Sequence, residues 1–357
     1  MLWGKPRIDT IILKTDCKNI NMEIVKKAAY ILQKGGLVAF PTETVYGLGG
    51  NGFDIKACKK IYEAKGRPSD NPLILHISSI DDLDRIIAYK PKEAEKIMSA
   101  FWPGPITLIF PKSSSVPKEI TGGFDTVAVR FPSNELARKI IEYANVPVAA
   151  PSANSSGKPS PTRASHVEFD LKGKIDMIVD GGACEVGLES TILDLTQSPP
   201  MILRPGAITK EMLEEVIGKV DIDPSILKNP TGNFSPKAPG MKYKHYSPKA
   251  KVILVRGEIE KVISKINELS KKDIKDGFKV GVMATTQTKS KYICDTVLCV
   301  GDREKIETVA INLFKTLRKF DFMNVDIVYA EVFDESGEGA AIMNRLNKAA
   351  GFNYIDV

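Results

Sequence analysis

The stretch LVAFPTETVYGLGG, residues 37–50, sets the fold class of this chain. Its first four residues are apolar, which is typical of a strand that is buried on both faces. Residues 22–34 just before it carry apolar side chains at helical spacing, between a capping Asn21 and the helix-ending pair Gly35-Gly36. A helix that leads directly into a buried strand indicates an α/β protein.

Strand-like and helix-like segments continue to about residue 218. We expect a second helix to follow Asp54 and to end near Lys65. Further short apolar runs predict strands at Leu73–Ile77, Ile106–Phe110, Thr126–Phe131, Val146–Ala150, Met177–Val179, Ser190–Leu195 and Met201–Leu203. Many strands with helices between some of them predict a twisted, mixed α/β sheet.

The composition changes after residue 218, where prolines and glycines become frequent. We therefore predict three parts: a first domain over 1–218, a linker or lid over 219–249, and a smaller Rossmann-like α/β domain over 250–357. The strands of this last domain are expected at Val252–Val255, Val280–Met283, Val297–Val300 and Val325–Tyr329, with a helix near 303–320. No GxGxxG follows its first strand, which argues against a dinucleotide site there.

Composition narrows the classes of function. The chain has 357 residues and a formal charge of +6, which favours anionic substrates or transient RNA contact over permanent nucleic-acid packaging. It has no apolar run of about 18 residues, so we expect no membrane span. Five scattered cysteines and three histidines argue against a metal site and for a reducing, cytoplasmic location.

Two short motifs carry candidate anion-binding groups. Ser152 and Asn154 follow an apolar run and lie two positions apart, so in an extended chain they face one partner. Pro68 favours an extended Arg67, so that Arg67 and Lys65 project to one side. Such cations would grip a polyphosphate, although a basic helix end stabilised by the helix dipole explains them equally simply. The chain has no Walker A motif, which disfavours a P-loop enzyme.

Other polar residues interrupt apolar strands. Arg130 lies between Val129 and Phe131, and a buried arginine needs an anionic partner, which is either a protein carboxylate or a ligand. His76 lies within an apolar run, where a packing role is the commoner one. In the linker, residues 239–246 hold two tyrosines, two lysines and a histidine, which suit either a nucleotide cover or a solvated tether.

Seven segments occur together and in a fixed order. They are Pro41–Gly50, Lys65–Pro68, Asn71–Leu73, Pro103–Pro105, Ala150–Asn154, Glu189–Thr191 and Leu203–Gly206. In this set the chain resembles the YrdC-like family of threonylcarbamoyl-AMP synthases, and specifically its larger two-domain branch. The resemblance implies a concave, positively charged first domain that makes threonylcarbamoyl-AMP and pyrophosphate from L-threonine, bicarbonate and ATP. It also implies that a Kae-type transferase uses the product to form threonylcarbamoyladenosine beside the anticodon of tRNA.

The resemblance also assigns roles to residues. It implies that the matching catalytic residues are Lys65, Arg67, Ser152 and Asn154. It implies L-threonine contacts from Thr44, His76, Arg130, Ala150 and Ser190. It implies ATP contacts from Arg67, Asn71, Thr126, Ser152, Ser160, Arg204 and Tyr243, with His245 or Tyr246 as alternatives to Tyr243. Mg²⁺ is expected to be held by ATP and water rather than by a protein site, and no covalent enzyme intermediate is expected.

Two other functions remain open from the sequence. One is a module that binds tRNA or double-stranded RNA without catalysis, although the candidate site lacks interleaved aromatic residues. The other is a carbamoyltransferase that uses carbamoyl phosphate, against which the unpaired cysteines argue because that architecture carries cysteine-rich zinc segments.

Overall fold

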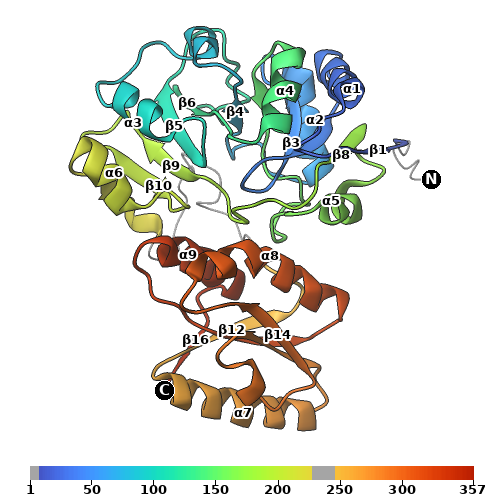
Figure 1. The fold of residues 1–357 in the computed structure, drawn as a ribbon, viewed down its shortest axis with the longest axis vertical. Helices are drawn as coiled ribbons and strands as arrows, with labels where there is room; N and C mark the ends of the chain where they lie inside the picture. Colours follow the sequence, from blue (N-terminus) through green and yellow to red (C-terminus); the bar gives the residue numbers. More distant parts are fainter. Residues whose placement is uncertain (1–7, 227–245) are drawn as a thin grey trace.

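The computed structural model describes residues 8–226 and 246–357, which form two lobes (Figure 1). The first lobe is built on an eleven-stranded sheet with the order β1-β8-β2-β3-β7-β4-β6-β5-β9-β10-β11. Its strands are β1 Ile11–Lys14, β2 Val38–Pro41, β3 Tyr46–Asn51, β4 Ile74–His76, β5 Ile106–Pro111, β6 Thr126–Arg130, β7 Val148–Ala149, β8 Met177–Asp180, β9 Thr191–Asp194, β10 Met201–Arg204 and β11 Asp221–Ile222. Neighbouring strands are parallel in some pairs and antiparallel in others, which confirms the predicted mixed sheet.

Helices pack on both faces of this sheet, and their ends follow from local sequence. The helices are α1 Met22–Gln33, α2 Ile55–Lys65, α3 Ala94–Phe101, α4 Glu135–Ala144, α5 Ala164–Leu171 and α6 Lys210–Ile217. The side chains of Asn21 and Asp54 cap α1 and α2 by accepting bonds of 3.0 and 2.8 Å from backbone N–H groups in the first turns. Gly66 ends α2 in the left-handed conformation, at a φ of 61°.

Two cores lie on opposite faces of the sheet. On β8, Met177 and Val179 pack with α1 and α4, whereas Ile178 joins the core that contains α2 and α3. Alternate side chains of one strand therefore point into different cores, as strand geometry requires. This explains why the predicted strands are apolar throughout rather than alternating.

The second lobe has a five-stranded sheet with the order β14-β13-β15-β12-β16, and every pair in it is parallel. Its elements are β12 Lys251–Arg256, α7 Ile259–Lys275, β13 Val280–Thr285, β14 Thr296–Gly301, α8 Ile306–Phe322, β15 Ile327–Glu331, α9 Glu338–Ala350 and β16 Tyr354–Asp356. Helices α8 and α9 lie between this sheet and the first lobe, and α7 covers the far face (Figure 1). The predicted Rossmann-like arrangement is confirmed, with β16 as a strand that the sequence analysis did not predict.

The segment between the lobes is described only in part. Strand β11 extends the first sheet past residue 218, and Ile226 packs into the core of the first lobe, so part of the predicted linker belongs to that lobe. Tyr243 and His245 lie outside the described residues, as do most of the predicted lid positions. Within the described ranges, no helix is long and apolar enough to cross a bilayer.

Two buried histidines are expected to make the stability of the protein depend on pH. Burial, followed by nearby arginines, lowers the pKa of His76 to about 3 and that of His166 to about 4. The Nδ1 atom of His166 accepts a bond from the N–H of Thr162 at 3.2 Å, so this nitrogen is unprotonated. An unfolded histidine has a pKa of about 6.5, so below that pH the unfolded state binds protons that the folded state does not.

The free energy of unfolding should therefore fall between about pH 6.5 and 4, by about 1.4 kcal/mol per pH unit for each histidine. Urea unfolding of the wild type and of His166→Gln at several pH values in this window would measure how much His166 contributes to the pH dependence of the unfolding free energy. We expect a shallower pH dependence in the variant, and equal slopes would contradict the neutral state of His166. Carboxylates titrate in both proteins and cancel in the comparison.

Candidate active site

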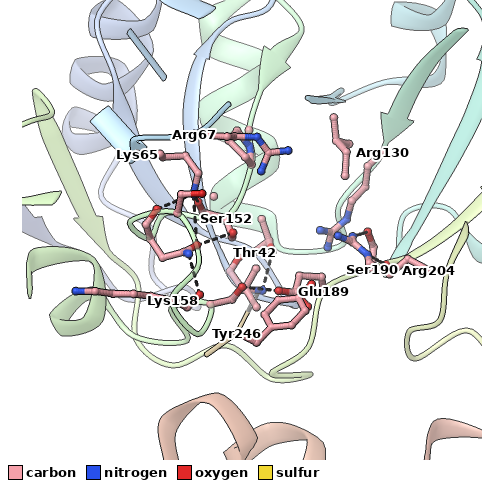
Figure 2. Close-up of a pocket in the computed structure, with 18 of the residues that line it drawn as sticks. Thr42, Lys65, Arg67, Arg130, Ser152, Lys158, Glu189, Ser190, Arg204 and Tyr246 are labelled. Atoms are coloured by element: carbon pink, nitrogen blue, oxygen red, sulfur yellow. Dashed lines mark hydrogen bonds between the residues drawn. The ribbon is translucent and has the colours of Figure 1, made fainter. Parts of the chain in front are cut away.

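A pocket lies where strand ends of the first lobe meet the loop after Ala150 and the start of the second lobe (Figure 2). Its wall includes Thr42, Lys65, Arg67, His76, Arg130, Ala150, Ser152, Asn154, Lys158, Ser160, Glu189, Ser190, Arg204 and Tyr246. Five of the residues that line it are lysine or arginine, and one is an acid, Glu189. Such an excess of positive charge attracts an anionic ligand.

The lysine–arginine motif and the serine–asparagine motif meet in this pocket. Lys65, the last residue of α2, is buried, and its Nζ atom donates to the carbonyl oxygens of Ser152 and, at 2.6 Å, of Asn154. The hydroxyl of Ser152 donates to Asn154 Oδ1 at 2.6 Å, so the loop is organised around the lysine. Burial, followed by the charge of Arg67, lowers the pKa of Lys65 well below its usual range.

Arg67 extends the positive wall beside Lys65 (Figure 2). Its guanidinium donates to the carbonyl oxygen of Pro72 at 3.0 Å and to that of Asn71 at 3.4 Å. Burial lowers the pKa of Arg67 to about 10, so it remains charged at neutral pH. Within the described part of the chain, neither Lys65 nor Arg67 forms an ion pair. Buried charges without a counter-ion are costly, which favours an anionic ligand between them.

Arg130 stands on the opposite wall, at the end of β6. Its Nη2 atom lies 2.7 Å from Glu43 Oε1, and its Nη1 atom donates to Thr44 Oγ1 at 2.8 Å. Although burial opposes ionisation, Arg130 keeps the pKa of Glu43 below its usual value. The Nε atom of Arg130 is buried and has no hydrogen-bond partner among the described residues. The arginine therefore has a protein carboxylate as its partner and one buried donor that no described residue accepts from.

Ser190 and Arg204 complete this side of the pocket. Arg204 donates through Nε to the carbonyl oxygen of Ser190 and through Nη2 to its hydroxyl, both at 3.0 Å. Burial lowers the pKa of Arg204 to about 10, so it too remains charged. Ser190 also shares a hydrogen bond of 2.7 Å with Thr107, which fixes its hydroxyl at the strand end.

Two buried arginines of the second lobe hold segments that line the pocket, one near Glu189 and one near Pro159. Arg345 of α9 pairs with Glu189 at 3.1 Å and donates to the carbonyl oxygen of Pro205 at 2.5 Å, while Glu189 in turn accepts a bond from Ser160. Arg318 of α8 pairs with Asp170 at 2.8 Å and donates to the carbonyl oxygen of Pro159 at 2.6 Å. No role was predicted for these two arginines or for Glu189.

The sequence does contain a pattern that could have indicated a buried role for these two arginines. Arg345 lies between Ile342 and Leu346 on the apolar face of its helix, and Arg318 directly follows the buried Leu317. A cation on the buried face of an amphipathic helix indicates an acidic partner on another element. The sequence does not say which element that is.

Tyr246 forms the part of the wall that lies toward the second lobe (Figure 2). Its ring stacks on Phe314 with centroids 5.2 Å apart, and the guanidinium of Arg345 lies 5.8 Å from the ring centre. Burial raises the pKa of its hydroxyl to about 12. Of the three linker residues considered from the sequence, Tyr246 is the one within the described ranges, and it lines the pocket.

Two substitutions of Tyr246 distinguish the role of its ring from the role of its hydroxyl. Tyr246→Phe keeps the stacking on Phe314, so we expect a smaller loss of stability than for Tyr246→Ala, which should cost about 3 to 5 kcal/mol of unfolding free energy. If the hydroxyl contacts the nucleotide, Tyr246→Phe raises the KM for ATP. Urea unfolding and steady-state kinetics would measure the two effects, and an unchanged KM for ATP would exclude that contact.

Three of the remaining candidate residues lie outside the pocket wall. Thr44 lies behind it and contacts Arg130, and Thr126 lies at the end of β6 opposite to Arg130. Asn71 is buried with its Oδ1 atom unpaired among the described residues. Their contacts with substrates stay predictions. No group of three or more metal-ligating acids, cysteines or histidines occurs in the part of the chain that is described.

Both lobes match families of known proteins. A family model described as "Telomere recombination" matches residues 30–206, and one described as "Threonylcarbamoyl-AMP synthase, C-terminal domain" matches residues 208–351. The threonylcarbamoyl-AMP synthase of Pyrococcus abyssi is 51% identical over 93% of this chain and 96% of its own length. That of Bacillus subtilis is 47% identical over 96% and 97%.

A solved structure shows the same architecture. The crystal structure of Pyrococcus abyssi Sua5 complexed with L-threonine has a TM-score of 0.92 and 50% identity, over 98% of this chain and all of that one. Both lobes therefore have counterparts in one relative, in the same arrangement. The chain belongs to the threonylcarbamoyl-AMP synthase family.

Proposed function

We propose that this enzyme is an L-threonylcarbamoyladenylate synthase, a nucleotidyltransferase that makes threonylcarbamoyl-AMP and pyrophosphate from L-threonine, bicarbonate and ATP. The observation that carries the proposal is the buried pocket with five basic side chains and one acid. Two of these cations, Lys65 and Arg67, form no ion pair within the described residues. A polyphosphate together with an amino-acid carboxylate satisfies this charge pattern.

Both sides of the pocket contribute to substrate binding. Lys65, Arg67 and Arg204 neutralise the phosphates of ATP, while Ser152 and Asn154 position Lys65 through their carbonyl oxygens. The free Nε atom of Arg130 receives the carboxylate of threonine, with Ser190 beside it. His76 is neutral in this pocket and contributes shape and hydrogen bonding rather than charge.

The residues promote the reaction by holding the reactants in line. The threonine nitrogen bonds to the carbon of bicarbonate, and water leaves to give the carbamate. A carbamate oxygen then attacks the α-phosphorus, and the bond from that phosphorus to the bridging oxygen breaks, so that pyrophosphate departs with the electron pair. Orientation and neutralisation of the developing charge lower the barrier, and no protein nucleophile is needed.

Magnesium fits this pocket as a companion of ATP. The one wall carboxylate, Glu189, is already bonded to Ser160 and Arg345, so it is not free to act as a ligand. We propose that Mg²⁺ is held by phosphate oxygens and water, where it offsets negative charge. Lys65, Arg67 and Arg204 would remain the protein cations that face the phosphates.

We further propose that the product passes to a Kae-type transferase that modifies tRNA beside the anticodon. The formal charge of +6 is compatible with a transient tRNA contact. A cytoplasmic location likewise stays a prediction, supported by five cysteines that are all free thiols.

Pyrophosphate release tests the proposal directly. The full chain would be incubated with ATP and Mg²⁺, with threonine and bicarbonate each omitted in turn. Release that requires both substrates supports the synthase reaction. Release without either substrate contradicts it, and RNA binding with a steep salt dependence but no release would favour the non-catalytic RNA-binding module.

A further inference from the structure

The second lobe has a pocket of its own at the edge where its parallel strands end. The pocket has a volume of about 220 Å³ and shares no lining residue with the catalytic pocket. Gly257, Thr288, Arg303 and Val332, which line it, follow β12, β13, β14 and β15 respectively. Four consecutive strands of the lobe therefore contribute to one cavity.

This edge is where open parallel sheets generally bind ligands. The favoured place is the crevice between neighbouring strands whose connections leave toward opposite faces of the sheet. Strands β12 and β15 are such neighbours, because β12 leads into α7 on one face and β15 leads into α9 on the other (Figure 1). No GxGxxG motif follows β12, and a cavity of about 220 Å³ suits a ligand smaller than a dinucleotide.

The floor of this pocket is a buried carboxylate with four donors. Glu331 accepts bonds from Tyr292 at 2.8 Å and Thr285 at 3.3 Å, and also from Thr288 and the guanidinium of Arg303. Its side chain is 1% exposed. These contacts satisfy Glu331 and tie three strand ends together, which on its own would be a purely structural arrangement.

One buried nitrogen of this network has no hydrogen-bond partner among the described residues. Arg303 donates through Nη1 to the carbonyl oxygen of Val332 at 2.9 Å and through Nη2 to Glu331. Its Nε atom is buried and has no hydrogen-bond partner in the described ranges. An unpaired buried donor costs free energy, so the guanidinium suits a ligand that brings an acceptor.

The rest of the lining shows which ligand would fit. Lys291 adds a second cation, which pairs at 2.5 Å with the exposed Glu260 and can therefore be shared. The apolar part of the wall consists of Val255, Ile259, Val262 and Val332. We propose that this pocket binds a small organic anion, whose carboxylate or phosphate accepts from the half-buried guanidinium of Arg303 while a short apolar body packs against the aliphatic wall.

Hydrogen exchange of the full chain, followed by mass spectrometry, would locate the binding. The probes are isovalerate, inorganic phosphate and the neutral isoamyl alcohol. We expect isovalerate or phosphate to slow exchange in residues 255–262, 286–303 and 331–333. Slowing by isovalerate assigns the site to carboxylates, and slowing by phosphate alone assigns it to phosphate esters.

Two variants make the test specific. Arg303→Gln should weaken binding about tenfold, as expected for loss of a charge-assisted hydrogen bond. Arg256→Gln is the matched control, because Arg256 is an exposed arginine at the same sheet edge that does not line the pocket. Should Arg303→Gln not fold, Lys291→Gln, a change at an exposed side chain, replaces it with a smaller expected loss.

Three results would overturn the proposal. They are the absence of slowed exchange in these segments with either anion, equal slowing by isoamyl alcohol, and unchanged binding in Arg303→Gln, or in Lys291→Gln where that variant replaces it. Slowing confined to residues 150–160 would place the anion in the catalytic pocket and would also count against it.

Discussion

Replacing Arg130 with methionine is expected to weaken the use of threonine strongly and to destabilise the first lobe. The change removes the Nε donor proposed to receive the threonine carboxylate, and it leaves Glu43 buried without its partner at 2.7 Å. Loss of a charged hydrogen-bond partner should raise the KM for threonine by about tenfold to a hundredfold. Breaking the buried pair should cost about 3 to 5 kcal/mol of unfolding free energy.

A double variant separates the two effects. In Arg130→Met/Glu43→Gln the unpaired buried charge is gone, so most of the lost stability should return. Threonine use should not return, because no cation faces its carboxylate. Urea unfolding and pyrophosphate release over a range of threonine concentrations would measure both. A double variant that regains normal threonine dependence would show that Arg130 has only a structural role.

Replacing Arg345 with methionine is expected to impair catalysis from the other lobe. The substitution removes an ion pair of 3.1 Å with Glu189 and a bond to the carbonyl oxygen of Pro205. A buried Glu189 without its partner should cost about 3 to 5 kcal/mol. Because Glu189 also accepts a bond from Ser160 and precedes Ser190, we expect kcat/KM to fall by at least about tenfold.

Two comparisons control for general damage to the second lobe. Arg256→Met removes an exposed pair with Asp356, which should change stability by less than about 1 kcal/mol and leave kcat/KM unchanged. Arg345→Met/Glu189→Gln should recover stability but not full activity. If Arg345→Met keeps normal kcat/KM once it is folded, then the second lobe does not position the catalytic pocket.

Much of the fold could be predicted because it depends on neighbours along the chain. Asn21 and Asp54 cap helices within their own first turns, and the apolar run before Pro41 becomes β2. The order of the strands in the eleven-stranded sheet could not be predicted, since strand pairing depends on contacts between distant segments. The sequence analysis also missed β16, because its three residues carry little pattern of their own and the strand is defined by its pairing with the distant β12.

The candidate site, too, could be predicted only in part. By itself, the sequence determined the fold class, the resemblance to the family, and the residue types that bind anions, including the pairs Lys65 with Arg67 and Ser152 with Asn154. Only the tertiary structure decided that Lys65 organises the loop of Ser152, that Arg130 pairs with Glu43, and that Arg345 reaches Glu189 across 156 positions of sequence. The physical reason is that a motif records local spacing, whereas the partner of a buried charge is set by the packing of whole elements.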